Sequence, residues 1–314
     1  MPDAPIPTPP GVTGPWIAEP GWYDLTDDQY HADPVIGGSL SSTGARTLLR
    51  SCPEQFAYDR EHGGPEKDEY DYGRAAHLEV LGVGGQVVVI EGTGKNPNAW
   101  ATKEDKAAVA AARAAGLTPI RPRDVDPIKA MAKRLREHPV VGKLFDRPGR
   151  AEQSYVGRDP ETGIMCRVRI DWLPDVADDD RVILVDYKSA RDAHPRAFAK
   201  AMADHEYHMQ FPFYGSVLQW LDLLHGRDPL YILVAQEKEP PYLVSYGWPS
   251  ARAIEWGKVR NRKARDIYRQ CVDSGRWPGY PDTPVEYDIP GWLDYQYTAD
   301  YDNGLYALTG DVPT

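Results

Sequence analysis

The run VILVDYKS, residues 182–189, carries four apolar residues directly into an acid and a base, Asp186 and Lys188. Side chains alternate along a β-strand, so these two lie on one face, about 6.6 Å apart along the strand. A second acid, Asp171, stands near the end of the preceding apolar run, IMCRVRIDWL. If the two runs pair across the turn PDVADDD, Asp171 falls beside Asp186. Two neighbouring carboxylates repel unless a cation lies between them, so the pattern predicts a cation site.

The residue types at this site favour phosphodiester hydrolysis. Oxygen ligands with retained waters suit Mg²⁺, and Mn²⁺ is the other candidate. An ammonium beside the ion, Lys188, could hold the attacking water and balance charge as a phosphate becomes five-coordinate. The backbone carbonyl of Tyr187 lies between the two side chains and is predicted as a further ligand. The alternative for an Asp-x-Lys pair at a strand end is a surface ion pair.

Three β-like runs form the middle of the chain: AEQSYVG, IMCRVRIDWL and RVILVDYKS, joined by short turns typical of an antiparallel meander. On the second run, alternation predicts one apolar face with Cys166, Val168, Ile170 and Trp172, and one polar face with Arg167, Arg169 and Asp171. On the third run, Ile183, Val185 and Tyr187 are expected to face away from Asp186.

Helical patterns precede and follow these runs. EYDYGRAAHLEVLG predicts a helix ending at Gly82, and residues 98–115 and 124–139 predict two more. A long helical pattern over residues 195–224 is expected to break at Pro212. Two more β runs and a basic helix from about residue 250 to 274 complete the pattern. The fold class expected is α/β, a central mixed sheet flanked by helices, with an N-terminal helical elaboration.

The expected domain organisation has three parts. Residues 1–37 are rich in Pro, Gly and Asp and predict an irregular arm. Residues 38–275 are expected to form one domain, with a mainly helical part over 38–150 and the sheet core with the candidate site over 151–275. Residues 276–314 predict an acidic irregular tail.

Composition narrows the class of protein. The net charge of −11 argues against a protein that coats nucleic acid nonspecifically, but residues 121–150 and 252–276 are locally basic. Both segments are candidates for the DNA path. The walls of a DNA channel are expected to be the helical opening SLSSTGARTLLRSCPEQFAY and the basic helix over residues 252–276, although a basic helix can equally be a solvated face. No run approaches the length needed to cross a bilayer, and the N-terminal residues lack a signal-peptide pattern, so the expected location is the cytoplasm. Three scattered cysteines give neither a disulfide framework nor a metal knuckle.

Five short motifs in order resemble the PD-(D/E)xK nuclease superfamily, and within it the RecB/RecE-like phage and bacterial exonucleases. They are GRAAHLEVLG with His77, AEQSYV with Glu152, CRVRIDWL with Asp171, VDYKSA with Asp186 and Lys188, and YHMQFPFYG with Gln210 and Tyr214. The segment SLSSTGARTLLRSCPEQFAY also resembles the helical opening of RecE-type nucleases. The resemblance spans about residues 30–275.

The resemblance implies that Asp171 and Asp186 bind the metal and that Lys188 assists the nucleophile. It implies that His77 is a metal ligand or lies beside the metal; the alternative is a core histidine. Glu152 is implied as an additional acid for a second metal or a water, with an exposed glutamate as the alternative.

Gln210 and Tyr214 are four residues apart on one helix face, which suits holding a phosphate or orienting Lys188. For Tyr214 the alternative is ordinary aromatic packing. The resemblance also has limits in this chain. The three scattered cysteines predict no iron–sulfur cluster, and no GxxxxGK[ST] motif occurs that would indicate a fused helicase.

The function expected is a Mg²⁺-dependent deoxyribonuclease, an exonuclease that resects double-stranded DNA ends for recombination. One alternative is a single-strand or structure-selective endonuclease. Another is an inactive DNA-binding or scaffold protein with the same fold, against which the intact Asp171, Asp186 and Lys188 argue. Likeness alone implies a homo-oligomeric ring, a strand-annealing partner protein and, for a phage-encoded protein, the cytoplasm of a bacterial host.

Overall fold

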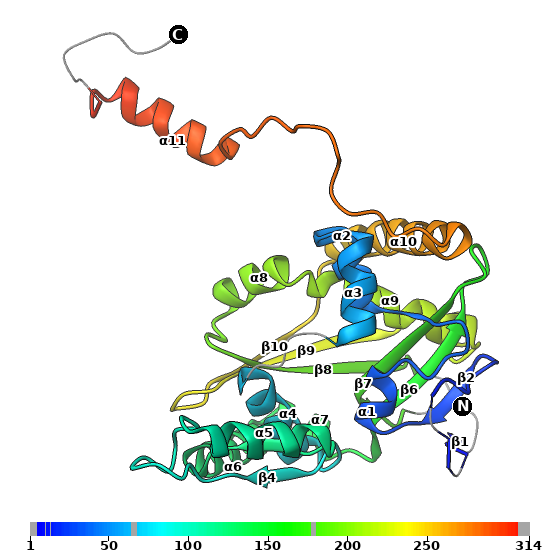
Figure 1. Ribbon diagram of the computed structural model, residues 1–314, viewed down its shortest axis with the longest axis vertical. Helices are drawn as coiled ribbons and strands as arrows, with labels where there is room; N and C mark the ends of the chain where they lie inside the picture. Colours follow the sequence, from blue (N-terminus) through cyan, green and yellow to red (C-terminus); the bar gives the residue numbers. More distant parts are fainter. Residues whose placement is uncertain (1–4, 10, 13, 64–67, 177–179, 307–314) are drawn as a thin grey trace. The chain divides into compact units, whose positions relative to one another are not determined.

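The structure is a computed structural model that describes residues 5–9, 11–12, 14–63, 68–176 and 180–306. The chain divides into two compact units, residues 1–278 and 279–314. The larger unit is built around a mixed β-sheet with helices packed on both of its faces (Figure 1). The α/β fold class predicted from the sequence is therefore confirmed.

The sheet runs in the order β1-β2-β6-β7-β8-β9-β10, and β3 pairs with β7. The strand bounds are Ile6–Pro7 (β1), Gly21–Asp24 (β2), Leu40–Ser41 (β3), Gly149–Arg158 (β6), Met165–Pro174 (β7), Ile183–Ala190 (β8), Leu230–Glu237 (β9) and Val244–Gly247 (β10). As predicted, β6, β7 and β8 form an antiparallel meander. The next pair, β8 and β9, is parallel, because a helical crossover connects them.

Two helical layers cover the sheet. The helix bounds are Asp27–His31 (α1), Ser42–Arg50 (α2), Pro53–His62 (α3), Asp68–Leu81 (α4), Lys103–Ala114 (α5), Pro122–Arg136 (α6), Val141–Phe145 (α7), Pro195–Asp204 (α8), Tyr207–Trp220 (α9) and Ala251–Ser274 (α10). Apolar residues of α2, α3, α9 and α10 pack on one face of the sheet in a single buried cluster. Those of α4, α6 and α7 pack on the other face in a second cluster. Both faces of β7 and β8 are thus buried.

The predicted alternation holds along β8 but not along all of β7. Val182 and Leu184 belong to the first cluster, while Val185 and Tyr187 belong to the second. On β7, however, Trp172 lies in the second cluster, opposite to the face expected for it. The register places Glu152 of β6 opposite Asp171, and Glu152 has a left-handed backbone with φ of 52°. The alternation changes at this irregular position, which simple period-two counting cannot anticipate.

Three segment predictions need correction. The expected irregular arm contributes β2, which pairs with β6, and it also contains α1. The tail expected to be irregular contains a helix, α11 (Gly291–Asp302). The long helical pattern breaks at Glu206, which has φ of 54°, whereas Pro212 lies inside α9. Nine of the fourteen residues of α9 are buried, so core packing offsets the backbone hydrogen bond that the proline removes.

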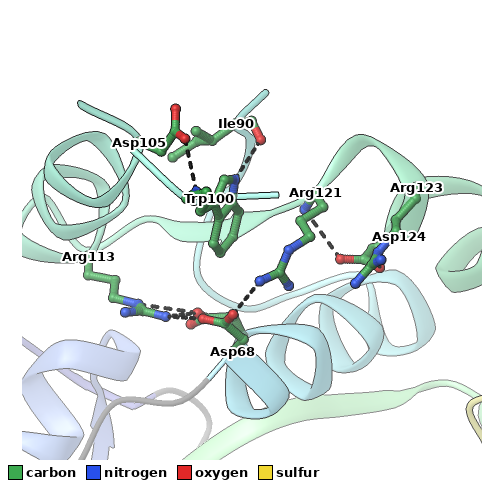
Figure 2. Close-up of polar contacts among 10 residues, drawn as sticks. Asp68, Ile90, Trp100, Asp105, Arg113, Arg121, Arg123 and Asp124 are labelled. Atoms are coloured by element: carbon green, nitrogen blue, oxygen red, sulfur yellow. Dashed lines mark hydrogen bonds and ion pairs between the residues drawn. The ribbon is translucent and has the colours of Figure 1, made fainter. Parts of the chain in front are cut away.

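A group of ion pairs anchors the beginning of α4 (Figure 2). The Arg113 guanidinium of α5 lies 2.5 Å from Asp71 and 3.1 Å from Asp68. Arg121, at the start of α6, also pairs with Asp68 and stacks over the ring of Trp100, 4.2 Å from its centroid. Two helices therefore hold α4 by its first turn. The same helix carries His77.

Next to these helices is a small parallel sheet of two strands, β4 (Val87–Val89) and β5 (Thr118–Ile120). Within the second unit, α11 has no buried residue. Over the described residues, no helix is long and apolar enough to span a membrane.

Candidate active site

The register of β7 and β8 brings the two predicted aspartates together. Trp172 pairs with Val185, so Asp171 and Asp186 occupy the next antiparallel position. The Asp171 carboxylate accepts a hydrogen bond of 2.8 Å from the backbone N–H of Tyr187. Asp186 is only 2% exposed. A surface ion pair is therefore the wrong interpretation of the Asp-x-Lys motif.

Lys188 and Gln210 share one oxygen of Asp186. Lys188 Nζ lies 2.7 Å from Asp186 Oδ1, and the Gln210 amide nitrogen donates to the same oxygen. Gln210 is also 3.1 Å from the Tyr214 hydroxyl, as expected for residues four apart on a helix. Lys188 Nζ lies 5.5 Å from the centroid of the Tyr207 ring. The helix α9 thus places three polar side chains against the end of β8.

A second group of potential ligands lies on the other side of Asp171. One donor atom from each of His77, Glu152 and Asp171 lies within 4.8 Å of the others. His77 Nδ1 is 3.8 Å from Glu152 Oε1 and 3.9 Å from Asp171 Oδ2. Glu152 is also held by Arg169, at 2.6 Å. The alternatives of an exposed glutamate and of a histidine enclosed in the apolar core are both wrong, because both side chains are partly buried and line a cleft.

Burial and neighbouring charges shift the pKa values of Asp171, Lys188 and His77. Burial and the neighbouring Asp186 raise the pKa of Asp171 to about 7. Burial alone would lower the pKa of Lys188, but Asp186 and Asp171 outweigh it and raise that pKa above its ordinary value. In the same way, burial opposes protonation of His77, while Asp171 and Glu152 raise its pKa. In the metal-free protein, Lys188 is therefore held as an ammonium beside the two aspartates.

A divalent cation fits the chemistry of these residues. The second carboxylate oxygen of Asp186, Oδ2, is buried and has no hydrogen-bond partner among the described residues. An ionised carboxylate oxygen buried without a partner is costly, and burial together with the charge of Asp186 likewise disfavours the ionised form of Asp171. Asp171, Asp186, Glu152 and His77 would hold the ion, which would neutralise the carboxylates and polarise a phosphate oxygen. The predicted contribution of the Tyr187 carbonyl stays a prediction.

The site opens into a cleft of about 1040 Å³. Its floor includes Glu152, Asp171 and Lys188, and α4 contributes His77 to one wall. The opposite wall includes polar residues of α2, with Arg46 among them. The motifs did not single out Arg46 or Tyr207. The only sequence signal for Arg46 is the polar stripe of the helical opening, which the resemblance includes as a segment without naming a residue.

The two basic segments proposed for the DNA path do not line this cleft. No described residue between 121 and 150 or between 252 and 276 borders it. On α10, Arg269 pairs with Asp273 and Arg262 with Asp266, each one turn further along the helix. Other residues of α10 pack on α9 in the core. As far as the catalytic cleft is concerned, the expectation that α10 forms a wall is wrong. Four of its arginines are instead held by acids, either one turn along the helix or, for Arg260 and Arg265, outside α10 at Glu206 and Asp159.

Comparisons with known proteins agree with this geometry. Residues 89–283 match a family model described as "PDDEXK-like domain of unknown function (DUF3799)", and this chain belongs to that family. The structure resembles a crystal structure from Eubacterium rectale described as "Putative exonuclease", with a TM-score of 0.55. The two chains are 9% identical, and the match covers 87% of this chain and 98% of the other. No curated protein matches the sequence. The predicted membership of the PD-(D/E)xK superfamily is confirmed.

Proposed function

We propose that this protein is a metal-dependent DNA exonuclease that resects double-stranded DNA ends. One observation carries the proposal: β7 and β8 deliver Asp171 and the buried Asp186 to neighbouring positions, with Lys188 2.7 Å from Asp186, and Asp171 and Lys188 line an open cleft. The PDDEXK-like family and the likeness to an exonuclease fold support it.

The chemistry follows from the charges. Mg²⁺ or Mn²⁺ is the proposed ion, because the ligand set is dominated by carboxylate oxygens. Lys188 is held as an ammonium by two carboxylates and can donate hydrogen bonds to a water or a phosphate oxygen. Gln210 bridges Asp186 and Tyr214 and so restricts where the Asp186 carboxylate points. We assign Gln210 and Tyr214 a positioning role.

The finer parts of the proposal rest on the resemblance to RecB/RecE-like nucleases. These are the preference for duplex ends, the role in recombination, a ring-shaped homo-oligomer and a strand-annealing partner. For a phage-encoded protein the resemblance also implies the bacterial cytoplasm. The proposed nuclease domain spans residues 38–275, with β2 of the preceding segment added to its sheet.

The test is a cleavage assay on end-labelled linear, nicked and closed-circular DNA, with Mg²⁺, with Mn²⁺ and with EDTA. We expect loss of linear duplex from its ends with either metal, no loss in EDTA and an intact closed circle. Cleavage of the closed circle would instead indicate an endonuclease. No cleavage of any duplex or single strand with either metal would contradict the proposal and favour a DNA-binding role.

The matched variants are Asp186→Asn and Asp204→Asn. Each removes the acid of an Asp–Lys pair, but Asp204 pairs with Lys200 on the surface, at 2.6 Å. We expect Asp186→Asn to abolish cleavage and Asp204→Asn to leave it unchanged. If the two variants are equally active, Asp186 is not part of the catalytic site, even if the wild-type protein cuts DNA.

A further inference from the structure

Helix α2 turns a polar stripe toward the catalytic cleft. Its apolar residues Ala45 and Leu48 are buried in the first core cluster. The residues on the other side of the helix border the cleft; they are Ser42, Thr43, Arg46, Thr47 and Arg50. Positions 42, 46 and 50 are successive turns of one face, about 6 Å apart along the axis. The mechanism proposed above uses none of them.

The two arginines of this stripe are not held by acids. Arg46 donates to the backbone carbonyl of His205 at 3.0 Å and to the Thr43 hydroxyl at 3.0 Å. Its guanidinium also lies 5.9 Å from the Tyr207 ring centroid, the same ring that Lys188 approaches. Among the described residues, neither Arg46 nor Arg50 forms an ion pair, although Arg50 is close enough to Asp204 for its charge to help lower the pKa of that aspartate. The positive charge at this wall is therefore available to an anion.

A second observation at the start of α2 points to a ligand. Ser42 is 4% exposed and lines the cleft, and its hydroxyl has no hydrogen-bond partner among the described residues. Ser41 caps the helix by accepting from the Gly44 N–H. The helix dipole adds partial positive charge at this end. A buried hydroxyl that lacks a partner, a helix N-terminus and two arginines together favour a bound oxyanion.

We propose that the face of α2 formed by Ser42, Arg46 and Arg50 binds the DNA backbone at phosphates beside the one that is hydrolysed. This inference rests on the proposed function and deepens it by assigning the substrate-binding wall. A guanidinium recognises the phosphate and not the base, so this wall binds DNA without sequence preference. The α2 face would hold the DNA strand in register with Lys188, which approaches the same Tyr207 ring as Arg46.

The test measures binding and not cleavage, in the full-length Asp186→Asn protein without added metal. Fluorescence anisotropy with a labelled oligonucleotide gives the dissociation constant across a salt series. We expect Arg46→Ala and Arg50→Ala each to weaken binding about tenfold at low salt, as for loss of a charge-assisted hydrogen bond. Each should also reduce the slope of log affinity against log salt by about 0.7 to 0.9, the value of one phosphate contact.

Arg269→Ala is the matched control, because Arg269 is an α10 arginine outside the cleft that pairs with Asp273. It should leave both affinity and slope unchanged. Arg46→Lys keeps the charge and should keep the wild-type salt slope. If Arg46 had only a structural role, neither Arg46→Ala nor Arg46→Lys would change that slope. If Arg46→Ala and Arg50→Ala match Arg269→Ala while the parent protein binds DNA, this inference is wrong and the proposed function stands. If the parent protein binds no DNA although the wild-type protein cleaves it, this inference is wrong and the proposed function stands; if the wild-type protein also leaves DNA intact, both are wrong.

Discussion

The catalytic floor and helix α10 are both rich in Asp, Glu, Lys and Arg, yet their charges are in different states. On α10, the side chains of Arg269 and Asp273 are 45% and 52% exposed, and each has the other as its partner. At the end of β8, the Asp186 side chain is 3% exposed and Lys188 is 22% exposed. Water screens the first pair, whereas the second pair lies where charges interact strongly.

The second difference is in the balance of charge. The α10 pairs neutralise themselves locally, as in many surface helices. At the catalytic floor, Asp171, Asp186 and Glu152 face a shared set of cations, and one oxygen of Asp186 has no partner among the described residues. Such an excess of buried negative charge is stabilised when a cation or a proton from solution binds to the carboxylates. An excess of buried carboxylates, and not the number of charged residues, distinguishes the catalytic floor from the exposed ion pairs of α10.

The first way to test this contrast is to replace Lys188, which should greatly lower the rate of DNA cleavage. Lys188→Ala removes the ammonium beside Asp186 and should lower the rate of DNA cleavage by about 100- to 1,000-fold, as for loss of one transition-state donor. A gel assay with excess Mg²⁺ measures it under single-turnover conditions.

Lys200→Ala is the control for this variant. Lys200 also pairs with an aspartate, but its side chain is 77% exposed. We expect wild-type cleavage from it. A Lys188→Ala protein that cuts at a similar rate would show that buried and exposed Asp–Lys pairs are equivalent here, contrary to the comparison above.

A smaller effect is expected of pH on the free energy of unfolding. Since the pKa of Asp171 is raised to about 7, the folded protein binds a proton there that the unfolded chain releases near pH 4. The free energy of unfolding of the metal-free protein should therefore fall as pH rises from about 4 to about 7. The raised pKa of His77 acts in the same direction, because the stability it adds at low pH is lost as pH rises through its folded value.

Urea unfolding in EDTA at pH 5 and pH 8 tests this dependence. We expect Asp171→Asn to reduce the difference, because it removes the titrating acid but can still accept from the Tyr187 N–H. Saturating Mg²⁺ should restore stability at pH 8. A metal-free protein that is equally stable at both pH values would contradict the surplus of buried charge.

Much of the catalytic floor can be predicted from the sequence because it depends on short-range rules. Alternation along one strand places Asp186 beside Lys188, and the small number of residues between the two β runs favours the antiparallel pairing that brings Asp171 beside Asp186. The helical spacing of Gln210 and Tyr214 is equally local. These are the residues that the motifs identified.

The rest depends on tertiary packing that no local pattern encodes. The face of Trp172 depends on the left-handed backbone of Glu152 on a neighbouring strand. The role of Arg46 depends on α2 reaching His205, 159 residues away in the sequence. Charge counting likewise favoured α10, because composition does not show that Arg262 and Arg269 each have an acid one turn away and that Arg265 pairs with Asp159 in the fold.

The smallest expected effect is at the surface pairs of α10. Removing the Arg269–Asp273 pair by Arg269→Ala should change the free energy of unfolding by no more than about 0.5 kcal/mol, the usual value for an exposed pair on a helix. The guanidinium is solvated whether or not Asp273 is present, so little desolvation energy is at stake. High salt should abolish even this difference, which urea unfolding at low and high ionic strength would measure. A loss of several kcal/mol, or a slower cleavage rate, would mean that α10 is coupled to the catalytic floor through its packing on α9. The ion pairs of α10 and those of the catalytic floor would then differ only in how strongly they contribute to stability and activity.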